Sequence, residues 1–184
     1  VLTLPVWNVS DVVYDMLVGH EVGHALFTPE ECRAPNIPAS FINVVEDARI
    51  ERKIKSTYPG ITKSFSAGYK ELNQRDFFDI QGKDLMKEFE LIDRINIYFK
   101  LGIHDVTCVV PFLKEEEPLV EKVRVASTFE EVLEAAKEIH EFMKSNKEQQ
   151  PIPPVPPSED INPGPVDTIE SDDEEEEETE DNTF

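Results

Sequence analysis

The sequence VGHEVGHALFTP (residues 18–29) contains two histidines four residues apart, with a glutamate directly after the first. On a helix, residues four apart lie on the same face, so His20 and His24 can offer two imidazole nitrogens to one metal ion. Glu21 is rotated by about 100° from His20, which suits a base acting on water beside the ion. The pattern predicts a catalytic zinc site. The alternative is a helix with two ordinary core or surface histidines.

The residues around this stretch predict that it lies on a buried helix. Ser10 followed by Asp11 is typical of a helix N-cap with an acidic first turn, so we expect a helix over about 11–27. Residues 28–38 contain three prolines and predict a loop. A second helix is expected from Pro38 or Ala39 to about residue 57, ended by the Tyr-Pro-Gly at 58–60.

A third metal ligand is expected on this second helix, within FINVVEDARIER (residues 41–52). Glu46 is our predicted ligand, because an antiparallel second helix would bring it back over the histidines. Asn43, Asp47 and Glu51 form a neighbouring stripe that could accept the second N–H group of a ligand histidine, and Asp47 is the preferred acceptor. Two alternatives stay open: Asp47 is the ligand with Glu46 in support, or these carboxylates form a solvated face paired with nearby basic residues.

The rest of residues 1–150 predicts a mainly α-helical domain with one short strand. The stretch VLTLPVW (residues 1–7) favours a strand. Apolar periodicity predicts helices over 61–77, 82–102, 115–124 and 128–145. The last of these would be opened by a capping box from Ser127/Thr128 to Glu130/Glu131.

Residues 151–184 differ sharply in composition and predict a disordered acidic tail or linker. They hold seven of the 14 prolines and 13 of the 39 acidic residues, with no lysine or arginine. Residues 1–150 therefore carry 26 acidic against 18 basic residues, a formal charge of −8. Neither part offers a basic stripe for nucleic acid. A role of the tail in binding a basic partner or a proline-recognising groove is the alternative.

The chain contains no run of some twenty apolar residues and no export leader, so we expect neither membrane insertion nor secretion but a cytoplasmic protein. Two cysteines, Cys32 and Cys108, are too few to predict a disulfide framework. Because the chain begins at Val1 inside a predicted strand, we expect the domain to be incomplete at its N-terminus.

The segments HEVGHALFTP and NVVEDARIERKIKSTYPG resemble the gluzincin branch of zincin metallopeptidases. They are most similar to peptidases encoded by tailed bacteriophages and to cobaltochelatase-type proteins in which a helical part precedes a von Willebrand factor A domain. The resemblance covers about residues 1–60. It implies a zincin-like domain with His20, His24 and Glu46 as zinc ligands and Glu21 as general base. Better-known gluzincins have an Asn-Glu pair where this chain has Val45 before Glu46.

The expected function is a zinc-dependent endopeptidase acting on protein or peptide substrates, in the host cytoplasm if the protein is phage-encoded. One alternative is a non-hydrolytic, metal-stapled module that works with a missing C-terminal A-type domain and an AAA+ ATPase. Another is a structural virion or assembly protein. Cobalt or manganese would also suit two imidazoles and a carboxylate. Nothing in the spacing selects an oxyanion donor among Tyr58, Tyr69, Tyr98 and His104.

Overall fold

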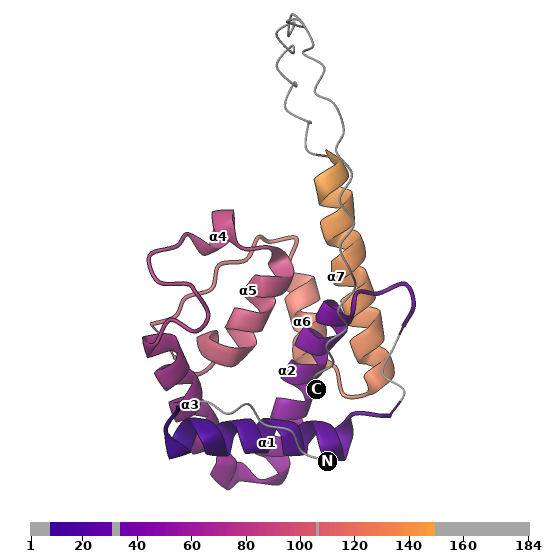
Figure 1. Ribbon diagram of the computed structural model, residues 1–184. Coiled ribbons are helices and arrows are strands. Elements are labelled where there is room, and N and C mark those ends of the chain that lie inside the picture. The colour runs from indigo at the N-terminus through magenta and orange to yellow at the C-terminus, as the bar shows by residue number, and fades with distance from the viewer. Residues whose placement is uncertain (1–7, 31–33, 106, 150–184) are drawn as a thin grey trace, which may run out of the picture. The chain divides into compact units, whose positions relative to one another are not determined.

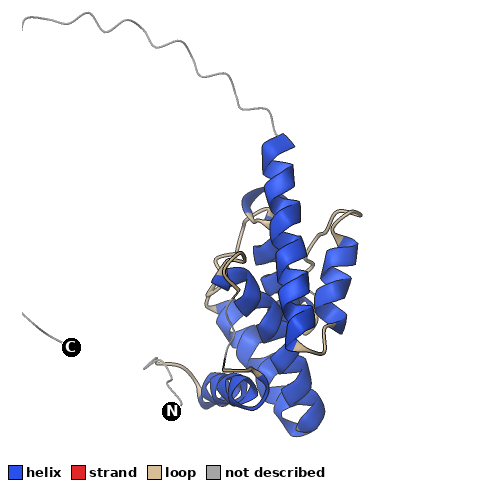
Figure 2. Cartoon of the chain, turned by 90° about the vertical axis from the view of Figure 1, so that its right-hand side faces the viewer, coloured by secondary structure: helices blue, strands red, loops and turns tan. Residues whose placement is uncertain are grey.

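The computed structural model describes residues 8–30, 34–105 and 107–149 of the 184-residue chain, with side chains up to residue 147. Every regular element in these ranges is a helix (Figures 1 and 2), so the predicted mainly α-helical class is confirmed. The chain divides into two units, residues 1–150 and 151–184. The strand predicted at residues 1–7 and the tail predicted at 151–184 lie outside the described residues.

The first helix, α1 (Asp11–Phe27), begins where the sequence predicts. The Ser10 hydroxyl caps it by accepting a hydrogen bond from the Val13 amide at 3.3 Å, and Asp11 lies in the first turn, where a negative charge favours the helix dipole. The buried side of α1 includes Val13, Met16 and two glycines. The helix therefore turns its small residues, as well as its apolar ones, towards the rest of the protein.

Those small residues let α1 pack closely on α2 (Ala39–Thr57) and α3 (Thr62–Gln74), as Figure 1 shows. A Cβ atom on Gly23 would lie 3.0 Å from the Ile50 Cδ1 atom of α2. A Cβ atom on Gly68 of α3 would lie 2.9 Å from the Cβ atom of Met16 of α1. A Cβ atom at Gly68 would come closer to Met16 than real Cβ atoms come to their neighbours, and one at Gly23 would make a tighter contact than most, so a side chain at either position would force its neighbours to shift.

The predicted long helix over 82–102 is wrong. The structure instead has α4 (Leu85–Glu88), an extended residue at Phe89, α5 (Leu91–Ile97) and a π-helical turn, η2 (Tyr98–Gly102). The break has a local cause: Glu90 and Asp93 form a capping box that starts a new helix, with the Glu90 amide donating to Asp93 Oδ2 at 3.2 Å. Capping thus overrides the apolar periodicity that runs through both segments.

The remaining helices follow the predictions closely. A short 3₁₀ turn, η1 (Pro59–Ile61), links α2 to α3, and α6 (Glu117–Val125) precedes α7 (Phe129–Gln149). The capping box of α7 uses Thr128 and Glu131, because the Glu131 carboxylate accepts from the Thr128 amide at 3.0 Å and the Thr128 hydroxyl accepts from the Glu131 amide at 3.3 Å. Figure 2 shows α7 standing lengthwise beside the other helices.

Two hydrophobic cores meet at α2. One joins α2 to α5, α6 and α7 around residues such as Val45, Ile95 and Ile139. The other joins α1, α2, α3 and η2 around residues such as Met16 and Phe65. Because α2 packs against a core on each side, it cannot rotate about its own axis. The directions in which its polar side chains leave the helix are therefore fixed. Among the described helices, none is long and apolar enough to cross a membrane.

Candidate metal centre

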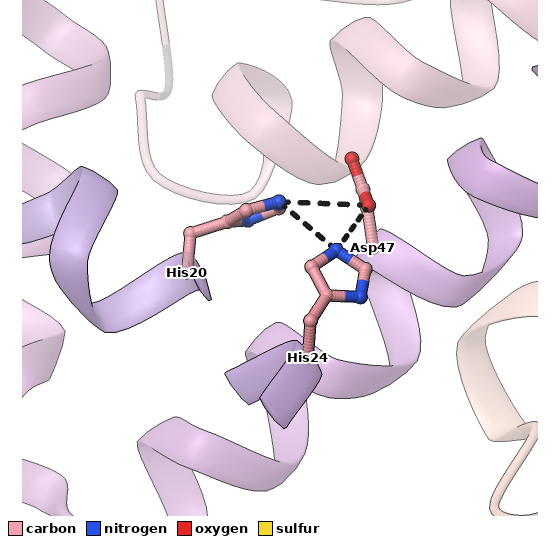
Figure 3. A group of neighbouring side chains, drawn as sticks. All are labelled: His20, His24 and Asp47. Atoms are coloured by element: carbon pink, nitrogen blue, oxygen red, sulfur yellow. Dashed lines mark hydrogen bonds and ion pairs between the residues drawn. The ribbon is translucent and has the colours of Figure 1, made fainter. Parts of the chain in front are cut away.

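Two histidines of α1 and one aspartate of α2 turn their side chains towards a common point (Figure 3). His20 Nε2 lies 3.2 Å from His24 Nε2. Asp47 Oδ1 lies 3.1 Å from His24 Nε2 and 3.6 Å from His20 Nε2. The three side chains are partly buried, with exposed fractions of 16%, 30% and 20% for His20, His24 and Asp47. One nitrogen from each ring and one carboxylate oxygen therefore form a compact triangle.

This triangle fits a zinc ion in size and chemistry. In a tetrahedral site with bonds of about 2.0–2.1 Å, neighbouring ligand atoms lie about 3.3 Å apart. The three separations in the structure, 3.1, 3.2 and 3.6 Å, fall around that value. Two imidazoles and one carboxylate also form a donor set typical of catalytic zinc, which needs three protein ligands and one open position.

The second nitrogen of each ring has an acceptor that fixes the tautomer. His20 Nδ1 lies 3.1 Å from Glu51 Oε1, and His24 Nδ1 lies 2.9 Å from the Thr28 hydroxyl. The Thr28 hydroxyl in turn donates to Glu46 Oε1 at 2.6 Å. When both rings are neutral with the proton on Nδ1, both Nε2 lone pairs face the triangle. The hydrogen bond of His24 with Asp47 needs a proton on Nε2 and so belongs to the doubly protonated His24 ring. Such outer partners orient metal-ligating histidines and raise their basicity.

Glu46, the predicted third ligand, is not part of the triangle. Its carboxylate accepts hydrogen bonds from Arg49 Nε at 2.7 Å and Arg49 Nη2 at 2.6 Å, as well as from Thr28. The structure therefore brings Asp47, and not Glu46, next to the two histidines, while Glu46 contacts His24 through Thr28; this is the arrangement that the alternative left open by the sequence describes. Asn43, predicted as a supporting residue, is exposed on the wall of the adjacent cleft. The hydrogen bonds described for the two histidines go elsewhere.

Glu21 lies beside the triangle, in a cleft of about 880 Å³ that His20 and Asp47 also line. The cleft runs between α1, α2, α3 and the segment around α4 and α5. Its apolar wall includes Leu17, Phe78 and Phe89. A glutamate on the wall of this cleft, one residue after a candidate ligand, is placed to exchange a proton with a molecule bound there.

Positive charges balance the buried carboxylates. Lys100 Nζ lies 2.9 Å from Asp47 Oδ2, and Lys55 Nζ lies 3.0 Å from Glu51 Oε2. Burial alone would raise the pKa of Asp47, but the hydrogen bond with His24 and the charge of Lys100 hold that pKa well below its usual range. Burial likewise opposes ionisation of Glu51, yet the hydrogen bond with His20 and the two lysines lower its pKa to about 2. Both carboxylates are therefore charged at neutral pH.

The basic partners respond to the same network. The hydrogen bond with Asp47 raises the pKa of His24 above 6.5, against the effect of burial. Burial disfavours the charged form of Lys100, but the carboxylates of Asp47 and Glu51 outweigh burial and raise the pKa of Lys100. Lys100 is thus an ammonium group in contact with the candidate ligand.

The structure separates the four candidate oxyanion donors. Tyr69 lines the cleft, but its hydroxyl donates a hydrogen bond to Glu51 Oε1. Burial and this carboxylate raise the pKa of Tyr69 well above 10, so the hydroxyl keeps its proton. Tyr58 is 54% exposed, Tyr98 packs against Phe99, and His104 stacks on Tyr69. Of the four, Tyr69 alone is among the residues lining the cleft.

Sequence reasoning missed two residues of the site. Thr28 lies four residues after His24, directly after the end of α1, and this spacing was a usable signal. Lys100 is 53 residues from Asp47, and no local pattern connects the two positions. A scan of the chain against protein-family models, and searches of curated proteins and of solved structures, found no match.

Proposed function

We propose that this chain is a zinc-dependent peptidase domain, with His20, His24 and Asp47 as metal ligands and Glu21 as general base. The observation that carries the proposal is the convergence of His20 Nε2, His24 Nε2 and Asp47 Oδ1 beside a cleft that Glu21 lines. A purely structural zinc site is usually closed by four protein ligands, whereas this set leaves one position for water or substrate. No fourth His, Cys, Asp or Glu joins the cluster within the described part of the chain.

Zinc, when bound, would supply Lewis-acid chemistry that polarises a carbonyl and lowers the pKa of an attacking water to about 7. The residues of the chain do the remaining work. Glu21 takes the proton from the attacking water and passes it to the leaving amine. Glu51 and Thr28 keep His20 and His24 in the tautomer that presents Nε2.

The cleft is roomy, with a volume of about 880 Å³, near the upper end of the range of ordinary ligand pockets. Apolar side chains on its wall, including Leu17, Phe78 and Phe89, could receive the side chains of a peptide. Asn43 and Asn96 on the same wall offer donors and acceptors for a peptide backbone. We therefore propose a protein or peptide as the substrate, cleaved internally.

The first test is the zinc content of the purified full chain, measured by elemental mass spectrometry. We expect about one zinc per chain. The double variant His20→Ala/His24→Ala should lose the metal, and His140→Ala should retain it, because His140 packs against Phe41 away from the cluster. Absence of metal from a folded chain after zinc is supplied would overturn the proposal.

The second test separates an enzyme from a metal-stapled binding module. Glu21→Gln should abolish cleavage of a peptide mixture, as followed by mass spectrometry, while zinc content stays unchanged. Glu30→Gln, at an exposed position just beyond α1, is the matched control and should cleave like the parent chain. A zinc-loaded parent chain without Glu21-dependent cleavage would favour the non-hydrolytic module.

A further inference from the structure

Lys100 contacts the oxygen of Asp47 that faces away from the histidines. Its Nζ atom lies 2.9 Å from Asp47 Oδ2, whereas Oδ1 lies 3.1 Å from His24 Nε2. A carboxylate can bind a metal through one oxygen or through both. With Oδ2 engaged by an ammonium group, only Oδ1 is available on the side of the triangle.

The ammonium group is held in place by several neighbours. Lys100 extends from the π-helical turn η2, and its side chain is 16% exposed. Nζ lies 3.5 Å from the Tyr69 hydroxyl and 5.6 Å from the centre of the Tyr69 ring. It also lies 3.8 Å from Glu51 Oε1, the atom that accepts from His20 Nδ1. The ammonium group of Lys100 thus contacts the candidate ligand Asp47 directly. It reaches the candidate ligand His20 indirectly, through the Glu51 carboxylate.

We propose that Lys100 is a positioning residue that reserves Asp47 Oδ2, so that Asp47 binds the metal through Oδ1 alone and one coordination position stays open. This inference rests on the proposed zinc centre. If Oδ2 were free, the carboxylate could rotate and bind through both oxygens. The second oxygen would then take the position that a catalytic site keeps for water or substrate.

The competing explanation is that Lys100 only neutralises a cluster of buried acids. Lys55 provides a matched control. Like Lys100 it is a mostly buried lysine beside this cluster, with its side chain 13% exposed, but its ion pair, at 3.0 Å, is with Glu51 and not with Asp47. If charge alone matters, loss of either lysine should affect the centre in the same way. If the contact with Oδ2 matters, loss of Lys100 alone should change the coordination.

The experiment is visible absorption spectroscopy of the full chain loaded with Co²⁺, whose bands are strong in four-coordinate sites and weak in sites with more ligands. The parent chain should show the strong four-coordinate bands. Lys100→Met should lose much of that intensity as Oδ2 joins the metal. Lys100→Arg, which keeps a donor for Oδ2, and Lys55→Met should both retain the parent spectrum.

Metal affinity is a weaker readout for Lys100→Met, because two effects oppose each other. Loss of the nearby positive charge strengthens cation binding, whereas loss of the contact that orients Asp47 weakens it. Weak bands in the parent chain would overturn the role of Lys100, as would an unchanged spectrum in Lys100→Met or an equal change in Lys55→Met. If circular dichroism shows that Lys100→Met does not fold, the parent and Lys100→Arg spectra decide. Failure of the parent chain to bind either Co²⁺ or Zn²⁺ would instead overturn the metal centre itself.

Discussion

The Oδ1 atom of Asp47 lies 3.1 Å from the Nε2 atom of His24, although 23 positions separate the two residues in the chain. Glu46, the preceding residue, instead joins Thr28 and the buried guanidinium of Arg49. Two adjacent acids of α2 therefore have different neighbours: Asp47 faces the two histidines, and Glu46 contacts His24 through Thr28.

This difference predicts that two isosteric substitutions, Asp47→Asn and Glu46→Gln, lower zinc affinity to different extents. Asp47→Asn removes a ligand charge and should lower zinc affinity by at least about 100-fold, beyond the usual effect of losing an outer partner. Glu46→Gln acts only through Thr28 and should lower the affinity by about 10-fold or less. Competition with a fluorescent zinc chelator measures both. A larger loss in Glu46→Gln would restore Glu46 as the ligand.

Loss of Arg49 should destabilise the fold far more than loss of an exposed arginine. The side chains of Arg49 and Glu46 are 2% and 3% exposed, so Arg49→Met leaves a buried carboxylate without its partner, at a cost of roughly 3–5 kcal/mol. Arg124, 59% exposed and paired with Glu121, is the control, and Arg124→Met should cost less than about 1 kcal/mol. Urea denaturation measures both, and equal effects would contradict the prediction.

Close packing of α1 on α3 predicts that Gly68 tolerates no side chain. A Cβ atom there would lie 2.8 Å from Met16 Sδ and 2.9 Å from Met16 Cβ, so Gly68→Ala should force the helices apart and cost about 1–3 kcal/mol. Gly60 has no neighbouring atom within 4 Å of such a Cβ atom, and Gly60→Ala should be neutral or slightly stabilising. Thermal unfolding of the two variants checks the contrast; equal melting temperatures would refute it.

Glu51 should make the metal-free protein sensitive to acid. The pKa of this carboxyl is about 2 in the folded chain against an ordinary value of 4.5. Because the folded-state pKa is the lower one, the charged carboxylate contributes its full stabilisation above pH 4.5, and this is lost as pH falls from 4.5 towards 2.

The measurement is the urea midpoint across this pH range, with a chelator present. Glu51→Gln cannot titrate and should lose less stability over the range than the parent chain does. The exposed Glu30→Gln should follow the parent. If the stabilities of the parent chain and of Glu51→Gln change in parallel with pH, Glu51 does not contribute this pH-dependent part of the stability.

Local signals were enough to predict most helices. Ser10 and Asp11 mark the start of α1, and the Tyr-Pro-Gly at 58–60 follows α2. Both helices of the candidate metal centre were therefore predicted to within a residue or two. The break in the helix at Phe89 was not predicted. Its cause is the capping box of Glu90 and Asp93, and this is a weaker sequence signal than the apolar periodicity that continues past it.

The third member of the candidate metal cluster could not be selected from sequence because adjacent residues on a helix differ by about 100° in direction. Which of Glu46 and Asp47 faces the histidines depends on how α2 is rotated. That rotation is set by packing on both of its sides, including the contact of Ile50 with Gly23. Whether Lys100 reaches Asp47 depends on how η2 is placed against α2, and that placement is a property of the whole fold.

The candidate ligands and the acceptors of both Nδ1 atoms all lie between His20 and Glu51, on two neighbouring helices and the residue directly after the first. The centre is thus encoded by a single short stretch of chain. A protein designer could transplant this segment of two helices onto an unrelated scaffold as one unit. The recipient would then have to provide the cleft wall and a cation in the place of Lys100.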